Sequence, residues 1–172
     1  MIIEVEDIFM SDDPYQNLSL FQNLDPEQES ILRPLFLLRY LPLGTELFKQ
    51  GEPAETLYVV VEGEVHIRYK PDDGPALIVA RVQPEGVVGW SAAIGSPTYT
   101  SSAICVEDCQ LLCTKSQDLR QLCEDHRDTG RLLLERLASL ISDRLRNAHQ
   151  QVMALLEQGM QVDIASIQKS DK

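Results

Sequence analysis

The chain is poor in positive charge. Its 172 residues include 15 lysines and arginines against 27 aspartates and glutamates, which gives a formal net charge of −12 at pH 7. Proteins that bind nucleic acids neutralise phosphates with a basic face, and this sequence contains no cluster of lysine and arginine. We therefore expect no nucleic-acid partner for the chain, and the acidic surplus is better explained by solubility.

Long hydrophobic runs are also missing. No stretch approaches the roughly 18 consecutive apolar residues that a transmembrane helix needs. Residues 1–7 (MIIEVED) lack the basic start of a signal peptide. The sequence therefore predicts a cytoplasmic protein without membrane contact.

Cysteine pairs at metal-binding or redox spacing are absent. The four cysteines, at positions 105, 109, 113 and 123, include no CxxC pair. Free buried thiols are the simpler interpretation in a reducing compartment. Because Cys109 and Cys113 would share one face of a strand, a redox role of Cys105, Cys109 and Cys113 stays open.

Arrangements of catalytic residues are equally scarce. The three histidines, His66, His126 and His149, are isolated from any serine, cysteine or carboxylate pattern that could organise a nucleophile. We expect neither an enzyme nor a metal site.

What is present is a strand pattern between two helical regions. Asp25, Pro26 and Gln28 form an N-cap signature for a helix that runs to about Leu37. Short runs of apolar and β-branched residues follow, separated by turns such as residues 71–75 (PDDGP). These runs lie at residues 57–61, 64–69, 77–82, 102–106 and 110–114. Such spacing predicts an antiparallel barrel or sandwich, here a jelly-roll-like barrel.

The longest periodic segment runs from Asp128 to about Gln158, with its apolar residues in one stripe. A helix of about thirty residues is about 45 Å long, more than one domain of this size covers. We expect its far half to pair with a second copy of the chain; the alternative is a helix folded back over the barrel. The expected interface residues are Leu137, Ile141, Leu145, Ala148 and Val152.

These patterns divide the chain into four parts. We expect an arm of low order at residues 1–17 and a barrel with its N-terminal helix at residues 18–127. A long dimerisation helix follows at residues 128–159, and a polar tail at residues 160–172.

Between two of the predicted strands lies the glycine-rich segment 86–97 (GVVGWSAAIGSP). Its glycines allow tight turns, and residues 91–94 can form one helical turn. The free N–H groups of such a turn can bind an anion; a plain loop that crosses the end of a barrel fits the same residues.

Several of these features resemble the cyclic-nucleotide-binding domain family. They are the run LYVVVEGEV at residues 57–65, Phe48 with Gly51, Val88-Gly89 before a helical turn, and the segments 20–24 and 103–109. The long helix is similar to the dimer helix of the catabolite-activator and fumarate-nitrate regulator families. The resemblance implies a mainly β fold with flanking helices: an antiparallel double-stranded β-helix followed by a long C-terminal helix.

The resemblance also identifies the glycine-rich segment as the family's phosphate-binding cassette. In the family, a Glu after the Gly binds the ribose and a later Arg pairs with the cyclic phosphate. Here Trp90 follows Gly89, and residues 97–101 contain no arginine. Charged hydrogen bonds contribute roughly 1.5–3 kcal/mol each, so losing both weakens binding by on the order of a hundredfold to ten-thousandfold. Trp90 either takes the space of the ribose or serves as a core plug that closes the barrel mouth.

What remains is a rim of hydroxyl groups and backbone N–H groups. The candidate ligand-binding residues are Val88, Gly89, Trp90, Ser91, Ala92, Thr98, Thr100 and Ser101. The ligand implied by the resemblance is cAMP or cGMP, with both side-chain anchors missing.

We therefore expect a non-catalytic small-ligand sensor with a degenerate cassette. It would act as a homodimer on a protein partner in trans, because the tail after Gly159 is too short for the helix-turn-helix that follows the dimer helix in those transcription factors. The alternatives are a genuine cAMP or cGMP receptor that uses backbone and hydroxyl contacts, and a ligand-free structural or interaction protein.

Overall fold

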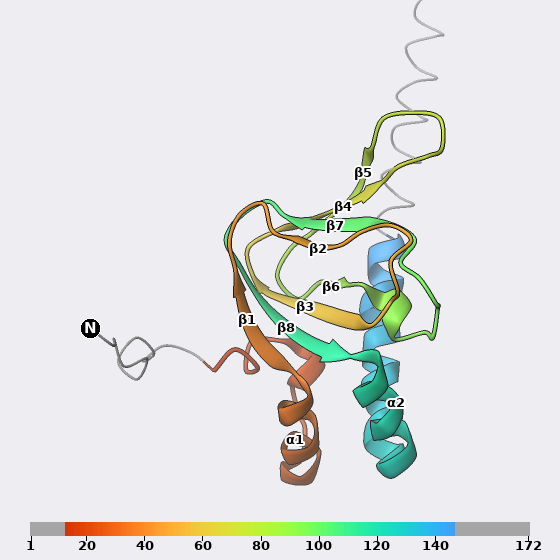
Figure 1. Cartoon of the computed structure of the whole chain (residues 1–172). Helices are drawn as coiled ribbons and strands as arrows, with labels where there is room; N and C mark the ends of the chain where they lie inside the picture. The colour runs from red at the N-terminus through yellow and green to blue at the C-terminus, as the bar shows by residue number, and fades with distance from the viewer. Residues whose placement is uncertain (1–12, 147–172) are drawn as a thin grey trace, which may run out of the picture.

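The computed structural model describes residues 13–146 of the chain and shows two antiparallel four-stranded sheets that form a roll (Figure 1). The first sheet has the order β1 (Leu37–Leu41), β8 (Cys109–Lys115), β3 (Thr56–Glu62) and β6 (Val87–Val88). The second has the order β2 (Glu46–Phe48), β7 (Ser102–Cys105), β4 (Val65–Tyr69) and β5 (Leu77–Val82). This confirms the predicted jelly-roll class.

Two apolar clusters hold the roll together, one on each face of the first sheet. Side chains alternate along a strand, so neighbours such as Val59 and Val60, or Leu112 and Leu111, belong to different clusters. Val60 and Leu111 belong to the interior cluster between the sheets, whereas Val59 and Leu112 belong to an outer cluster that the helices cover. The buried run at residues 57–61 is apolar without a break because it serves both.

Helix α1 (Pro26–Leu32) begins as the sequence predicts. The Asp25 carboxylate accepts a hydrogen bond from the N–H of Gln28 at 2.8 Å, and the Gln28 side chain accepts one from the N–H of Asp25 at 3.1 Å. The predicted end near Leu37 is wrong. A short 3-10 turn, η3 (Arg33–Leu35), replaces the last turn, because Pro34 has no N–H group to continue the helical hydrogen bonds.

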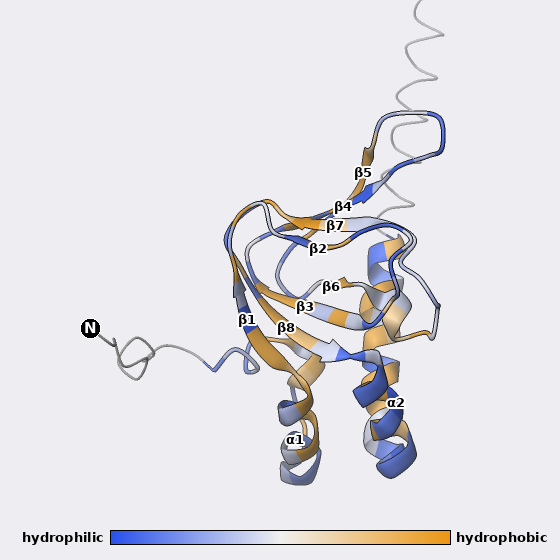
Figure 2. Cartoon of the chain, in the orientation of Figure 1, coloured by the Kyte–Doolittle hydropathy of each residue, from blue (hydrophilic) through white to orange (hydrophobic). Residues whose placement is uncertain are grey.

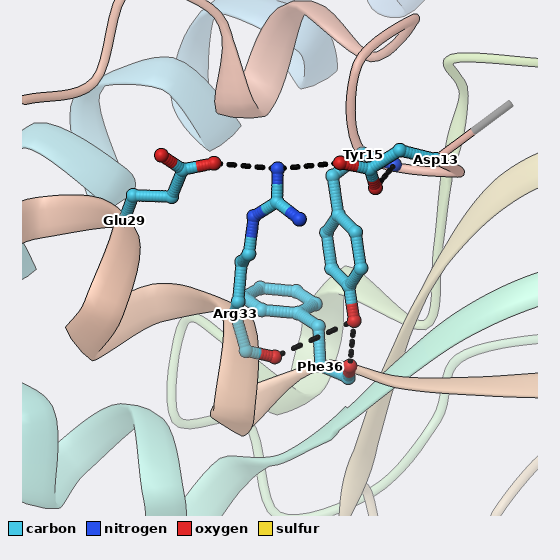
Figure 3. A network of polar contacts seen from close by, with 5 residues as sticks. All are labelled: Asp13, Tyr15, Glu29, Arg33 and Phe36. Atoms are coloured by element: carbon cyan, nitrogen blue, oxygen red, sulfur yellow. Dashed lines mark hydrogen bonds and ion pairs between the residues drawn. The ribbon is translucent and has the colours of Figure 1, made fainter. Parts of the chain in front are cut away.

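The described end of the predicted arm, residues 13–17, is held against α1 and η3 (Figure 3). The Arg33 guanidinium lies 2.6 Å from the Asp13 carboxylate and 2.5 Å from that of Glu29. The Tyr15 hydroxyl donates to the Phe36 carbonyl at 2.7 Å. Low order is therefore the wrong expectation for these five residues, because one guanidinium and one phenol tie them down; residues 1–12 lie outside the described part.

We expect Tyr15→Phe to lower the melting temperature by about 2–4 °C. The substitution keeps the ring, which meets Phe21 edge to face at a centroid distance of 5.1 Å. It removes the hydrogen bond to the Phe36 carbonyl, worth about 1 kcal/mol, and the longer one to the Arg33 carbonyl at 3.5 Å. Thermal denaturation followed by circular dichroism measures the change. The matched control is Tyr69→Phe. Tyr69 lies on β4 and is 42% exposed, so this substitution should leave the melting temperature unchanged. Equal effects of the two substitutions would refute this role of the hydroxyl.

Helix α2 (Ser116–Asp125) follows β8, and residues 127–146 form the described part of the C-terminal helix. Ser116 is the first residue of α2, and Lys115 is the N-cap residue before it. Leu133 and Leu137 of the C-terminal helix are 1% and 2% exposed and belong to the outer cluster. Leu137 is therefore wrongly assigned to a dimer interface, because its side chain is already buried in its own chain.

In the second sheet, β5 is an edge strand with no strand beside it on its outer side among residues 13–146. The β4–β5 hairpin stands away from the roll, and β5 carries an apolar stretch toward its outer end (Figure 2). Leu77, Ile78 and Val79 are each at least half exposed. The described chain thus exposes an apolar edge strand, a feature that proteins usually cover or protect.

Candidate functional site

The glycine-rich segment crosses from β6 to β7 and contains the predicted helical turn. This turn, η4 (Trp90–Ala92), follows Gly89, whose φ of +74° is strained for other residues. A side chain at Gly89 has no room, because a Cβ would lie 2.8 Å from the Thr56 carbonyl oxygen and 3.2 Å from the rings of Phe48 and Tyr99. The sequence Val-Gly before a helical turn is thus required by close packing as well as by backbone conformation.

The space beneath Gly89 is filled by aromatic rings. Tyr99, 5% exposed, stacks on Phe48 with a centroid distance of 3.7 Å and an interplanar angle of 13°. The centroid of the Tyr58 ring lies 6.1 Å from that of Phe48. We call Tyr58, Phe48 and Tyr99 the aromatic row; it occupies the interior of the roll next to the cassette.

Hydrogen bonds lock Tyr99 in this place. Its hydroxyl accepts a hydrogen bond from the Thr56 N–H at 2.9 Å and donates one to the Thr56 carbonyl at 2.7 Å. Burial raises the pKa of the Tyr99 phenol, against the lowering effect of these bonds. A neutral phenol that serves two backbone groups at once is a structural element of the interior, and the sequence analysis did not identify it.

The candidate ligand residues differ in their exposure. Val88, Gly89, Ser91 and Ala92 are buried, Ser101 is half-buried, and Thr98 and Thr100 are exposed. The neighbouring hydroxyls serve the backbone: Ser96 Oγ donates to the Thr98 carbonyl at 3.0 Å, and Ser102 Oγ accepts from the Gln50 N–H at 2.9 Å. The hydroxyl groups of Ser96 and Ser102 therefore stabilise the shape of the segment.

Trp90 does not plug the barrel mouth, so that interpretation is wrong. The side chain is half-buried and packs against the outer cluster, the one that contains Leu133 and Leu137. The interior is already filled by the aromatic row, whereas the C-terminal helix offers an apolar surface. Trp90 therefore packs on the helix-covered face of the first sheet, against the cluster to which the C-terminal helix also contributes.

A polar contact links the cassette segment to the C-terminal helix and was also missed. Arg144 Nη1 of the C-terminal helix donates to the Val87 carbonyl at 3.0 Å, and burial lowers the pKa of this guanidinium. Between Arg81 and Lys115 the sequence has no lysine or arginine. The cassette therefore has no cationic residue of its own, and the helix brings one to its edge.

The cysteines of the described chain are free thiols. Burial, followed by the neighbouring Cys109, raises the pKa of Cys105 to about 12. Cys109 Sγ donates to the carbonyls of Glu107 and Glu64 at 3.4 and 3.5 Å. Cys113, on the same face of β8, is half-buried. Within residues 13–146, no group of three or more potential ligands is placed to hold a metal ion, and none of the helices is long and apolar enough to cross a membrane.

A roll of two antiparallel sheets, a helical turn between β6 and β7, and a C-terminal helix hydrogen-bonded to β6 define a jelly-roll domain with a cassette. Residues 38–126 match the family described as the cyclic nucleotide-binding domain, and the chain belongs to this family.

Relatives of known role support the assignment. The chain is 30% identical over 129 residues to the cyclic AMP receptor protein of Thermus thermophilus, covering 75% of this chain and 58% of that protein. Among solved structures, the catabolite activator protein of Thermus thermophilus is 29% identical with a TM-score of 0.63, covering 79% of this chain and 62% of that one. The c-di-GMP-responsive global regulator CLP of Xanthomonas campestris is 25% identical with a TM-score of 0.65, covering 77% and 65%. The chain spans 58–62% of the length of its curated relatives, which are named as cyclic AMP receptor proteins or cAMP-activated transcriptional regulators.

Proposed function

We propose that the chain is a non-catalytic regulatory module whose cassette does not hold a cyclic nucleotide through side chains. The observation that carries this proposal is the Phe48–Tyr99 stack, which fills the interior beneath Gly89. A nucleotide in that place would have to displace a ring that is stacked, buried and doubly hydrogen-bonded.

The charges of the segment support the same proposal. A cyclic phosphate carries a negative charge into a partly dry pocket, where a guanidinium normally pairs with it. Residues 82–114 supply neither arginine nor lysine. Without such a pair, and without a carboxylate after Gly89, the affinity falls by on the order of a hundredfold to ten-thousandfold.

A genuine cyclic-nucleotide receptor is the second candidate, and two observations favour it. The relative from Thermus thermophilus is named as a receptor for cyclic AMP. Arg144 brings one guanidinium to the edge of the cassette, where its Nη1 now binds the Val87 carbonyl. In this second function, Arg144 would turn toward the phosphate, and the hydroxyl and N–H groups of the segment would complete the site.

Thermal denaturation with millimolar cAMP or cGMP distinguishes the two candidates. We expect a shift below about 1 °C, because a ligand stabilises a protein only above its Kd. In a receptor whose ligand is present at a hundred times its Kd, the free energy of unfolding would rise by about 2.7 kcal/mol. For a chain of this size, this raises the melting temperature by about 5–10 °C. Arg144→Gln is the matched variant, since it keeps a donor for Val87 and removes the charge. A large shift that Arg144→Gln reduces would replace our proposal by the second candidate.

The output of the module is also a proposal. The C-terminal helix would pair with that of a second copy, and the dimer would act on a protein partner in trans. Support for pairing comes from Leu134 and Leu145, which are 40% and 56% exposed on the described helix. Support for a protein partner comes from the net charge of −12, which disfavours nucleic acid. Ala148 and Val152, also assigned to the interface, lie outside the described residues.

A further inference from the structure

A separate cavity of about 340 Å³ opens at the side of the roll, between the edge strands β1 and β2 and the start of α2. None of its lining residues belongs to the cassette segment. The residues that matter for its chemistry are Leu37, Arg39, Leu47, Tyr58, Cys113 and Lys115. We call it the lateral pocket.

The register of the first sheet places these side chains together. Cys113 pairs with Leu37 on one side and with Tyr58 on the other, so the three form one row across the sheet. Arg39, two positions after Leu37, and Lys115, two positions after Cys113, point to the same face because side chains alternate along a strand. The pocket thus has an apolar floor with a cationic group on either side.

These two cations have no acidic partner in the described chain. Arg39 is exposed and forms no ion pair there, and Lys115 Nζ donates to the hydroxyl of Thr56 at 3.0 Å. Both charges act electrostatically on Cys113 at the floor of the pocket. Burial raises the pKa of Cys113 to about 11, and the positive charges of Arg39 and Lys115 act against that rise.

Two carboxylates, Glu46 and Asp118, also line the pocket. Glu46 lies 3.6 Å from Lys49 Nζ, so its charge is paired outside the floor. Asp118 stands in the first turn of α2, where the positive end of the helix dipole favours a carboxylate. Neither carboxylate forms an ion pair with Arg39 or Lys115 within residues 13–146, so both cations remain available to an anionic ligand.

We propose that the lateral pocket binds a small organic anion. A carboxylate or phosphate head would lie between Arg39 and Lys115, and an apolar body would contact Leu37, Leu47 and Tyr58. The volume of about 340 Å³ is at the lower end of the range of ligand pockets, so the ligand is small. This site is independent of the cassette, although Tyr58 belongs to both its floor and the aromatic row.

Isothermal titration calorimetry of the full chain with 2-naphthoate tests the proposal. We expect a Kd of about 0.1–1 mM, as ligand efficiency allows for a probe of this size. The neutral isostere 2-naphthamide should bind about tenfold more weakly, because it loses the charge-assisted bonds. Arg39→Gln and Lys115→Gln should each weaken the binding of naphthoate about tenfold and leave the binding of the amide unchanged.

Arg68→Gln is the matched control, since Arg68 is an exposed arginine of β4 that does not line the pocket. It should leave naphthoate binding unchanged, as should millimolar cAMP. The proposal is overturned if naphthoate does not bind at 10 mM, if the amide binds equally well, or if Arg68→Gln weakens binding as much as Arg39→Gln. A positive thermal shift with cAMP would refute the proposed function of the cassette and leave the lateral pocket untouched.

Discussion

Replacing Tyr99 by alanine should lower the melting temperature by about 6–20 °C. The side chain is 5% exposed and its ring stacks on Phe48 at 3.7 Å. Truncation of a buried aromatic residue to alanine costs about 3–5 kcal/mol, partly as lost burial and partly as a cavity. For a chain of this size, each kcal/mol corresponds to about 2–4 °C. Thermal denaturation followed by circular dichroism measures the effect.

Tyr99→Phe separates the two contributions of this residue. The ring and its stack remain, whereas the N–H and carbonyl of Thr56 lose the hydroxyl that serves both. Leaving buried polar groups unpaired costs about 1–3 kcal/mol, so this variant should fall between the wild type and alanine. A Tyr99→Ala protein that melts within 1 °C of the wild type would show that the ring does not fill the interior.

The stability of this stack bears directly on function. A receptor that binds a nucleotide inside its roll must keep that space open or open it at a cost in free energy. Under the proposed function, a nucleotide would need the space beneath Gly89, which Tyr99 and Phe48 occupy, so the energy that packs the ring would oppose ligand entry. Tyr99→Ala removes this opposition without adding a cation, so we expect at most a small gain in affinity for cAMP.

Much of the fold was predictable because its signals are local. The cap of α1 needs only Asp25 and Gln28, three positions apart, and both of its hydrogen bonds are present. The strand periodicity of β4 and the turn at Gly89 likewise follow from neighbouring residues. The short run around Val59 and Val60 was identified as buried because both of its faces are apolar.

The rest depends on partners that are distant in sequence. Tyr99 lies among hydroxyl residues and resembles part of a polar rim, but its burial is determined by Phe48, from another strand. Leu137 and Leu145 are equivalent in the apolar stripe, yet only the first meets the outer cluster. Trp90 could be assigned to the interior or the helix side only once the interior was known to be full. Periodicity shows that a residue is apolar on a helix face, not which surface covers it.

We expect Leu145→Glu to convert the protein from a dimer to a monomer. Leu134, Ile141 and Leu145 are not buried in their own chain, and with Ala138 they recur at alternating intervals of four and three residues, the spacing of a coiled-coil seam. In a parallel pair, the two new carboxylates would face each other in an apolar interface, where an unpaired charge costs several kcal/mol. Light scattering should then report 19.4 kDa in place of twice that mass.

Ser139→Glu is the matched control for this experiment. Ser139 is exposed on the same helix but lies outside the seam, so the substitution adds the same charge without entering the interface, and the dimer mass should persist. Because Leu145 is 56% exposed, its replacement leaves the outer cluster intact, and the monomer should keep the circular dichroism spectrum of the folded roll. An unchanged mass for Leu145→Glu would show that the helix does not self-pair through this seam. The exposed stripe would then belong to another partner, and the regulatory signal would leave the module through that contact instead of through a second copy.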